Sequence, residues 1–269
     1  MADSECAPLE NFRADVKLQC DCGQSARSRL SRNMPNRRRM QADQIAPQRS
    51  ARAGGQLTAA LLRSAPILAR AFFDRDPITV GRELLGKLLI RREGRKFLAG
   101  RIVENEAYLG AADPAAHAYA GFTPRNAVLF GPPGHAYVYF IYSSHYCLNV
   151  SCMPAGLGEG VLLRAMEPVF GLEAMARARS ISLPPAPRLA QLRMISSGPG
   201  RMSEALGITR LRDNDKDLTT RHSDLWFADD GYRPERIAAT PRIGIRKAVE
   251  EPLRFVIAGN PYVSAKRVK

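Results

Sequence analysis

The chain has 269 residues, enough for one large domain or two small ones, and 45% of them are hydrophobic, enough to fill a core. A net charge of +14 favours a polyanionic partner. No apolar run reaches the ~18–20 residues that span a bilayer, and the N-terminus lacks the apolar stretch of a secretory signal. Five cysteines do not suggest a disulfide framework in a chain this long. We therefore expect a cytoplasmic protein in a reducing compartment, with no membrane partner.

Residues 1–65 differ in composition from the rest of the chain. They contain a run of three arginines and little hydrophobic periodicity, and they carry 11 Lys/Arg against 6 Asp/Glu. This pattern predicts a mostly disordered basic extension with a short helix near Leu57–Leu62. Two other interpretations stay open, an Arg-rich targeting segment and an overextended gene start with Met34 or Met40 as the initiator. Residues 66–269 are expected to form the folded domain.

The folded domain is expected to start with a helix and to continue mainly in strands. Asp76-Pro77 is a good helix start, and apolar residues then recur at helical spacing at Val80, Leu84, Leu85, Leu88 and Leu89. Short helices are expected at Gly171–Arg179 and Gly200–Gly207. Strands are expected at Phe97–Ala107, Ala136–Tyr142, His145–Cys152, Gly160–Glu167, Thr240–Ile245 and Leu253–Ala258. The pattern predicts an α+β fold, a single mixed domain with a curved, largely antiparallel sheet, peripheral helices and a protruding β-hairpin.

Two carboxylates in the first predicted strand draw attention. Glu104 and Glu106 are two residues apart, so in a strand they project from the same face. A solvated outer face would account for both acids without any function. The residues that follow argue for a site instead. They are His117, an aromatic hairpin and Arg164 in an apolar strand, and together with an acid they are the parts of a site that binds a flat, polar heterocycle.

The hairpin from Tyr137 to Asn149 is rich in aromatic residues, with Ser143-Ser144 as the expected reversal. Aromatic cross-strand pairs stabilise hairpins, and Tyr137 and Phe140 are interpreted as core residues. Tyr142, at the tip, is harder to bury. On a basic protein it can act as a wedge between base pairs.

A flipped base needs stacking surfaces, hydrogen bonds to its edge and a catalytic group at the sugar. Tyr108 and Tyr139 can stack, and His117 and Asn149 can read the edge. The carboxylate of Glu106 can deprotonate a water for attack at C1′. A buried Arg164 needs an acidic partner, for which Glu106 is the natural candidate.

The chain resembles the alkyladenine (3-methyladenine) DNA glycosylase family and is similar to its bacterial members. The segments that carry the resemblance, in order, are Arg101–Gly110 (RIVENEAYLG), Ala115–His117, Thr123–Asn126 (TPRN), Pro133-Gly134, Tyr137–Asn149, Val161–Pro168 (VLLRAMEP), Ser197–Pro199, Asp215–Leu218 (DKDL) and Glu251–Phe255 (EPLRF). The match runs from about residue 66 to residue 264 without a missing block.

The resemblance implies roles for individual residues. Glu106 resembles the general base, and Arg164 and the backbone carbonyl of Ile243 resemble the groups that hold the attacking water. The walls of the base pocket are implied to be Tyr108, His117 and Tyr139. Asn149 resembles the residue that excludes normal guanine through its 2-amino group. DNA contacts are implied for Tyr142, as the intercalating residue, and for Thr123 and Arg125.

The implied activity is the removal of damaged purines from double-stranded DNA by a monomer that needs neither metal nor organic cofactor. No lysine or terminal amine occupies the catalytic position, so a Schiff-base lyase step is not expected. Ser143-Ser144 and His145 depart from the family pattern at the hairpin tip. Two other classes of function stay open. A non-catalytic nucleic-acid-binding protein would bind without releasing a base, and a nucleotide-binding or formyltransferase-like module would bind small nucleotides saturably.

Overall fold

Strand β2 (Lys96–Tyr108) is the 13-residue strand around which the sheet is built. Along one edge it pairs antiparallel with β5 (Glu159–Phe170). Along the other edge it pairs first with β1 (Leu88–Glu93) and then with β8 (Arg254–Ile257). Segments that lie more than 150 positions apart in the sequence therefore meet on one strand.

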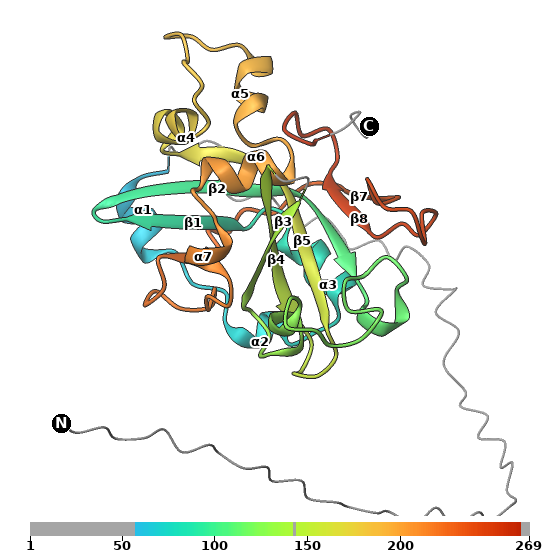
Figure 1. Cartoon of the computed structure of the whole chain (residues 1–269). Helices are drawn as coiled ribbons and strands as arrows, with labels where there is room; N and C mark the ends of the chain where they lie inside the picture. Colours follow the sequence, from blue (N-terminus) through green and yellow to red (C-terminus); the bar gives the residue numbers. More distant parts are fainter. Residues whose placement is uncertain (1–56, 142–143, 265–269) are drawn as a thin grey trace, which may run out of the picture. The chain divides into compact units, whose positions relative to one another are not determined.

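The computed structural model describes residues 57–141 and 144–264, and these contain an open, antiparallel sheet of eight strands (Figure 1). The strand order is β3-β4-β5-β2-β1-β6, with β7 paired to β8 beside β2. The remaining strands are β3 (Ala136–Ile141), β4 (His145–Cys152), β6 (Leu225–Ala228) and β7 (Ile237–Thr240). Register shifts between β2 and β5 accompany the bend of the long β2 ribbon. The predicted α+β fold with an antiparallel sheet is confirmed.

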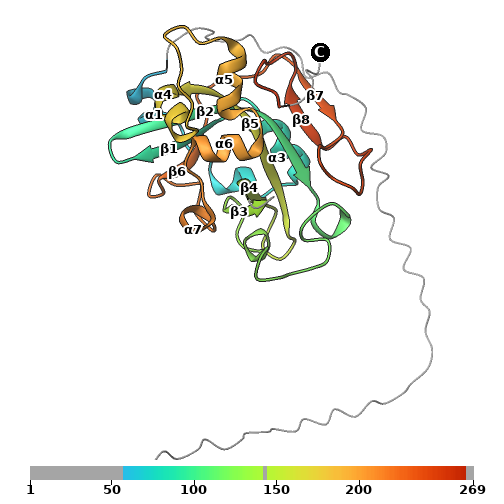
Figure 2. The same ribbon diagram turned by 45° about the horizontal axis from the view of Figure 1, so that its top comes forward.

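Helices cover the sheet. They are α1 (Ala59–Ser64), α2 (Arg70–Phe73), α3 (Pro77–Leu84), α4 (Leu172–Ala178), α5 (Leu189–Ser196), α6 (Pro199–Ala205) and α7 (Arg210–Asp213), with 3₁₀ turns η2 (Gly110–Ala112) and η3 (Ala127–Phe130). Helix α6 packs on β4 and β5 and in turn supports α4 and α5, as Figures 1 and 2 show. Helix α3 packs on β2 and β5. No helix in the two described ranges is long and apolar enough to cross a bilayer.

Helix α3 begins where the sequence predicts, but it ends at Leu84, before the last three apolar residues that were expected to belong to it. The side chain of Asp76 accepts two backbone N–H groups of the first turn, and Pro77 occupies the first helical position. Leu88 and Leu89, which were expected to continue the apolar face of this helix, instead lie fully buried in β1. Gly86, with a φ of +87°, turns the chain between the two elements.

The short helix expected near Leu57–Leu62 is present as α1. Leu62 is fully buried in a cluster that includes Ile90 and Trp226. Ordered structure therefore begins before Pro66. The disordered extension expected N-terminal to it lies outside the described residues from position 1 to position 56.

The expected strand at Thr240–Ile245 is wrong in position. β7 ends at Thr240, and residues 241–247 form an irregular loop. The pairing of β7 with β8 ends at Thr240, and beyond it the backbone N–H of Ile243 donates to the side chain of Glu106 instead of to a neighbouring strand. This loop forms one wall of the cavity described below.

Candidate active site

Glu106 lies on β2 with its carboxylate fully buried and both oxygens hydrogen-bonded. The backbone N–H of Ile243 donates to Oε1 at 2.8 Å, and the hydroxyl of Tyr108 donates to Oε2 at 2.9 Å. Arg164 pairs with Oε1 at 3.1 Å. Burial and then the adjacent negative charge raise the pKa of Tyr108, so its hydroxyl stays protonated and acts as the donor. Three donors from three segments thus orient the carboxylate.

Arg164, on β5, joins both carboxylates of β2. Its Nε donates to Oε1 of Glu104 at 3.0 Å, and its Nη1 contacts Glu106 and lies 3.5 Å from the carbonyl oxygen of Ile243. Burial acts to lower the pKa of Arg164, but the two glutamates outweigh it and the pKa is raised. The pairing expected between Arg164 and Glu106 is present, and Glu104 is an additional partner that the sequence argument did not assign.

A buried ion pair holds the loop after β7 in place. Nη2 of Arg242 donates to Oδ1 of Asp113 at 2.8 Å, and Nη1 contacts the other carboxylate oxygen. The same guanidinium lies 4.6 Å from the centre of the Tyr108 ring. Because Ile243 follows Arg242 directly, the ion pair fixes the backbone N–H that binds the carboxylate of Glu106.

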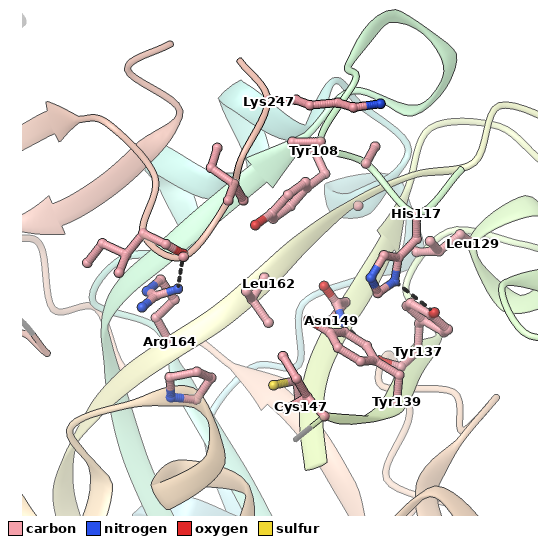
Figure 3. A pocket seen from close by; sticks show the side chains of 18 of the residues that line it. Tyr108, His117, Leu129, Tyr137, Tyr139, Cys147, Asn149, Leu162, Arg164 and Lys247 are labelled. Carbon is pink, nitrogen blue, oxygen red and sulfur yellow. Dashed lines mark hydrogen bonds between the residues drawn. The ribbon is translucent and has the colours of Figure 1, made fainter. Parts of the chain in front are cut away.

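A cavity of about 600 Å³ opens beside this network. Figure 3 shows Tyr108 and Arg164 on one side of it, with His117 and Tyr139 opposite. Seven of the residues singled out from the sequence line it, namely Tyr108, His117, Arg125, Tyr139, Asn149, Arg164 and Ile243. Glu106 does not line it directly, because the carboxylate sits behind Tyr108 and Arg164, which contact both the cavity and the acid.

The wall opposite Tyr108 is made of three aromatic rings. His117 lies edge-to-face with Tyr139, with ring centroids 4.5 Å apart, and Nδ1 of His117 is 2.9 Å from the hydroxyl of Tyr137. Partial burial and then the charge of Arg125 lower the pKa of His117 below its usual value. His117 is therefore neutral at pH 7, which leaves the cavity wall electron-rich.

Asn149 lines the cavity from β4 and is bonded to the neighbouring strand β3. Its side-chain nitrogen donates to the carbonyl oxygen of Tyr137 at 3.2 Å across the β3–β4 pair, and the residue is 6% exposed. A fixed amide at this depth can accept one base edge and sterically reject another.

The loop that carries His117 is shaped by Asn126. The side chain of Asn126 donates to the carbonyl oxygen of His117 and accepts the N–H of Thr123, at 3.0 and 2.7 Å. Thr123 is exposed and does not line the cavity, so its contacts shape the loop. Arg125 is exposed at the cavity and interacts with the Tyr137 hydroxyl.

Tyr142, the expected intercalating residue, lies outside the described residues. The hairpin that carries it is present as β3 and β4, with Ile141 opposite His145 as the last pair. His145 packs closely on Gly200 of α6, where a Cβ atom would come within 2.8 Å of the imidazole. The base of the hairpin turn is therefore seated on α6.

Some residues at the cavity carry no signal in the sequence that marks them as part of a site. Tyr137 is buried as expected but also lines the cavity, whereas Phe140, expected in the core, is 46% exposed. The ion pair between Asp113 and Arg242 could not be recognised from local sequence, because the two residues are 129 positions apart. Within the described ranges, no cluster of three or more His, Cys, Asp or Glu side chains is arranged to hold a metal ion.

Comparison with known proteins gives one consistent result. The sequence model of the family described as methylpurine-DNA glycosylase (MPG) matches residues 71–261. A protein of Koribacter versatilis, provisionally named 3-methyladenine DNA glycosylase, is 60% identical over 200 residues, which cover 74% of this chain and 94% of that protein. Proteins with the same provisional name in Burkholderia lata and Methanoculleus marisnigri are 50% and 46% identical, over 74% of this chain and 91% and 99% of theirs. The chain therefore belongs to the methylpurine-DNA glycosylase family.

Proposed function

We propose that this protein is a monofunctional DNA glycosylase that removes alkylated or deaminated purines from double-stranded DNA. The substrates would be of the 3-methyladenine, 7-methylguanine, hypoxanthine and ethenoadenine class. The observation that carries the proposal is the buried carboxylate of Glu106, oriented by Arg164, Ile243 and Tyr108 directly behind a cavity walled by aromatic rings. The family and the names of its relatives agree with this assignment.

In the proposed reaction the damaged nucleotide is flipped into the cavity and its base stacks between Tyr108 and the ring of Tyr139 or His117. A water molecule between Glu106 and the sugar is held by Arg164 and the Ile243 carbonyl. The water oxygen attacks C1′ and its proton passes to Glu106. The electron pair of the glycosidic bond leaves with the purine, so the strand keeps an abasic sugar.

The proposed selectivity follows from the cavity wall. Alkylated purines that carry a positive charge are good leaving groups, and electron-rich rings attract them by cation–π interaction. Neutral His117 adds no opposing charge at pH 7. The fixed amide of Asn149 is proposed to exclude guanine by contact with its 2-amino group. Neutral lesions such as hypoxanthine need more help from hydrogen bonds or protonation.

The proposed DNA contacts lie around the cavity mouth. Arg125 is exposed there and can bind a phosphate, whereas Thr123 contributes by shaping the same loop. Tyr142 is proposed to fill the gap that the flipped nucleotide leaves. One protein molecule is proposed to act on one lesion.

The test is incubation of the purified protein, in EDTA, with end-labelled duplexes that contain hypoxanthine, ethenoadenine or no lesion, alongside methylated DNA. We expect free damaged base, and strand breaks only after alkali. Breaks without alkali would indicate a lyase, for which Lys247 at the cavity would be the candidate amine. Tight binding without base release would instead favour a non-catalytic DNA-binding protein.

A further inference from the structure

Glu104 is fully buried on the same face of β2 as Glu106, and four donors bind its carboxylate. Nε of Arg164 and Nε of Arg254 donate to Oε1 at 3.0 and 2.8 Å. The hydroxyl of Ser264 donates to Oε1 at 2.9 Å, and its backbone N–H donates to Oε2 at 2.5 Å. The donors come from β5, from β8 and from the C-terminal segment beyond β8.

The position of Glu104 determines how the guanidinium of Arg164 is oriented toward Glu106, the proposed general base. A guanidinium is planar, so a bond that fixes Nε also fixes the direction of Nη1. In Arg164 that Nη1 is the atom that contacts Glu106 and the carbonyl of Ile243. Burial acts to raise the pKa of Glu104, but Arg254 and Arg164 outweigh it and the pKa is lowered, so Glu104 stays ionised beside both cations.

Stability of the fold does not by itself account for this arrangement. Two glutamates and two arginines are buried here with balanced charge, and Glu104 lines no part of the cavity. Replacing buried ion pairs by packed apolar groups is often neutral for stability or favourable. An apolar side chain has no acceptor and could not fix the orientation of the Arg164 guanidinium as Glu104 does.

We propose that Glu104 is a positioning residue for base excision: it aims Arg164 at Glu106, and Ser264 completes this support from the C-terminal segment. This inference rests on the proposed glycosylase function. It predicts that the chain must extend at least to Ser264 for full activity, although Ser264 does not line the cavity.

The test compares Glu104→Gln with wild type in single-turnover excision of hypoxanthine at saturating enzyme, and in affinity for a duplex with a stable abasic analogue. Glutamine has the same shape but cannot hold two arginines by charge. The excision rate should fall on the order of ten- to a hundredfold, because small displacements of catalytic groups have effects of this size, while affinity stays within about threefold.

Asp213→Asn is the matched control. Asp213 is a fully buried carboxylate that bonds Arg91 and Lys216, and none of these three residues lines the cavity. It should lower the thermal midpoint as Glu104→Gln does, with little change in the excision rate. If both variants lose excision in proportion to stability, Glu104 is only structural and the proposal fails.

Ser264→Ala keeps the proposal testable if Glu104→Gln does not fold, because it removes one of the four hydrogen bonds. Its excision rate should fall several-fold, and the same change should add nothing in a Glu104→Gln background that folds. An unchanged rate in Ser264→Ala, or independent effects in the double variant, would contradict the proposed link. Absence of excision by wild-type protein would reject the glycosylase function itself, whereas wild-type activity retained in Glu104→Gln would reject only the role of Glu104.

Discussion

The hydroxyl of Tyr108 donates a 2.9 Å hydrogen bond to Oε2 of Glu106, while the ring of the same tyrosine lines the cavity. The two residues are neighbours on one face of β2, so a single strand supplies both the stacking surface and the acid. A base that packs against the tyrosine therefore contacts the group that orients the carboxylate. Stacking of a lesion on Tyr108 and orientation of the Glu106 carboxylate, the proposed general base, would therefore be coupled.

Tyr108→Phe separates these two contributions. The ring remains and the donor to Glu106 is lost, and a hydrogen bond to a charged group is worth about 1.5–3 kcal/mol. We expect single-turnover excision to fall about ten- to a hundredfold with lesion affinity nearly unchanged. A large loss of affinity with normal excision at saturation would show that the hydroxyl acts in binding instead.

The charge of His117 should set a pH dependence that differs between lesions. Its pKa lies below the usual 6.5, so the ring gains a proton only as the pH falls below that value. The unfolded chain takes up this proton first, so the contribution to stability is present above about pH 6.5 and is lost on acidification. The added charge also repels a cationic base.

Excision of 7-methylguanine should therefore fall more steeply than excision of hypoxanthine as the pH drops from about 7 to 5. His117→Phe keeps an aromatic ring and removes the titration, so the difference between the two lesions should disappear. Parallel pH profiles for both lesions in the wild-type protein would contradict this role of the ring.

The ion pair between Asp113 and Arg242 should be important for stability. Removing one partner of a buried pair costs about 3–5 kcal/mol, so Asp113→Asn should lower the free energy of unfolding in urea by about that amount at pH 7. Burial acts to raise the pKa of Asp113, but Arg242 and the backbone N–H of Ala115 outweigh it and hold the pKa below 3.8.

A lowered folded-state pKa gives stability that is present above the unfolded value and is lost as the pH falls through the folded one. The difference between Asp113→Asn and wild type should therefore shrink below about pH 4. A difference that is independent of pH would mean that the aspartate acts through packing alone.

Deletion of residues 1–56 should leave the fold and the excision rate intact. This segment carries ten Lys/Arg and six Asp/Glu, so its loss removes positive charge from a protein that remains basic. Non-specific DNA binding at low salt should weaken, measured as a smaller dependence of affinity on salt. Loss of soluble protein on deletion would contradict a dispensable extension.

The sequence allowed prediction of elements whose signals are local. β4 matches its expected limits, and α3 begins at its capping Asp76, because alternation and capping depend on near neighbours. Leu88 and Leu89 fit the helical spacing of the residues before them, although they belong to β1. They point to opposite faces of the strand and both are buried, so β1 lacks the alternation by which a strand is recognised.

The hydrogen bonds and ion pairs around Glu104 and Glu106 could not be predicted from local sequence. Glu104 meets Arg254 and Ser264 across 150 and 160 positions, a proximity set by how β8 pairs with β2. Tyr137 was interpreted as a core residue because burial and lining a cavity leave the same aromatic signal in a strand. Only the folded structure distinguishes a core position from a position that lines the cavity.

The most direct test of the proposed glycosylase reaction is Glu106→Gln, compared with wild type in single-turnover excision and in affinity for lesion DNA. Glutamine keeps the shape of the side chain but cannot accept a proton from water. We predict that the variant binds lesion DNA at least as tightly as wild type and releases no base. Full excision by Glu106→Gln would contradict the proposed role of this carboxylate as the general base.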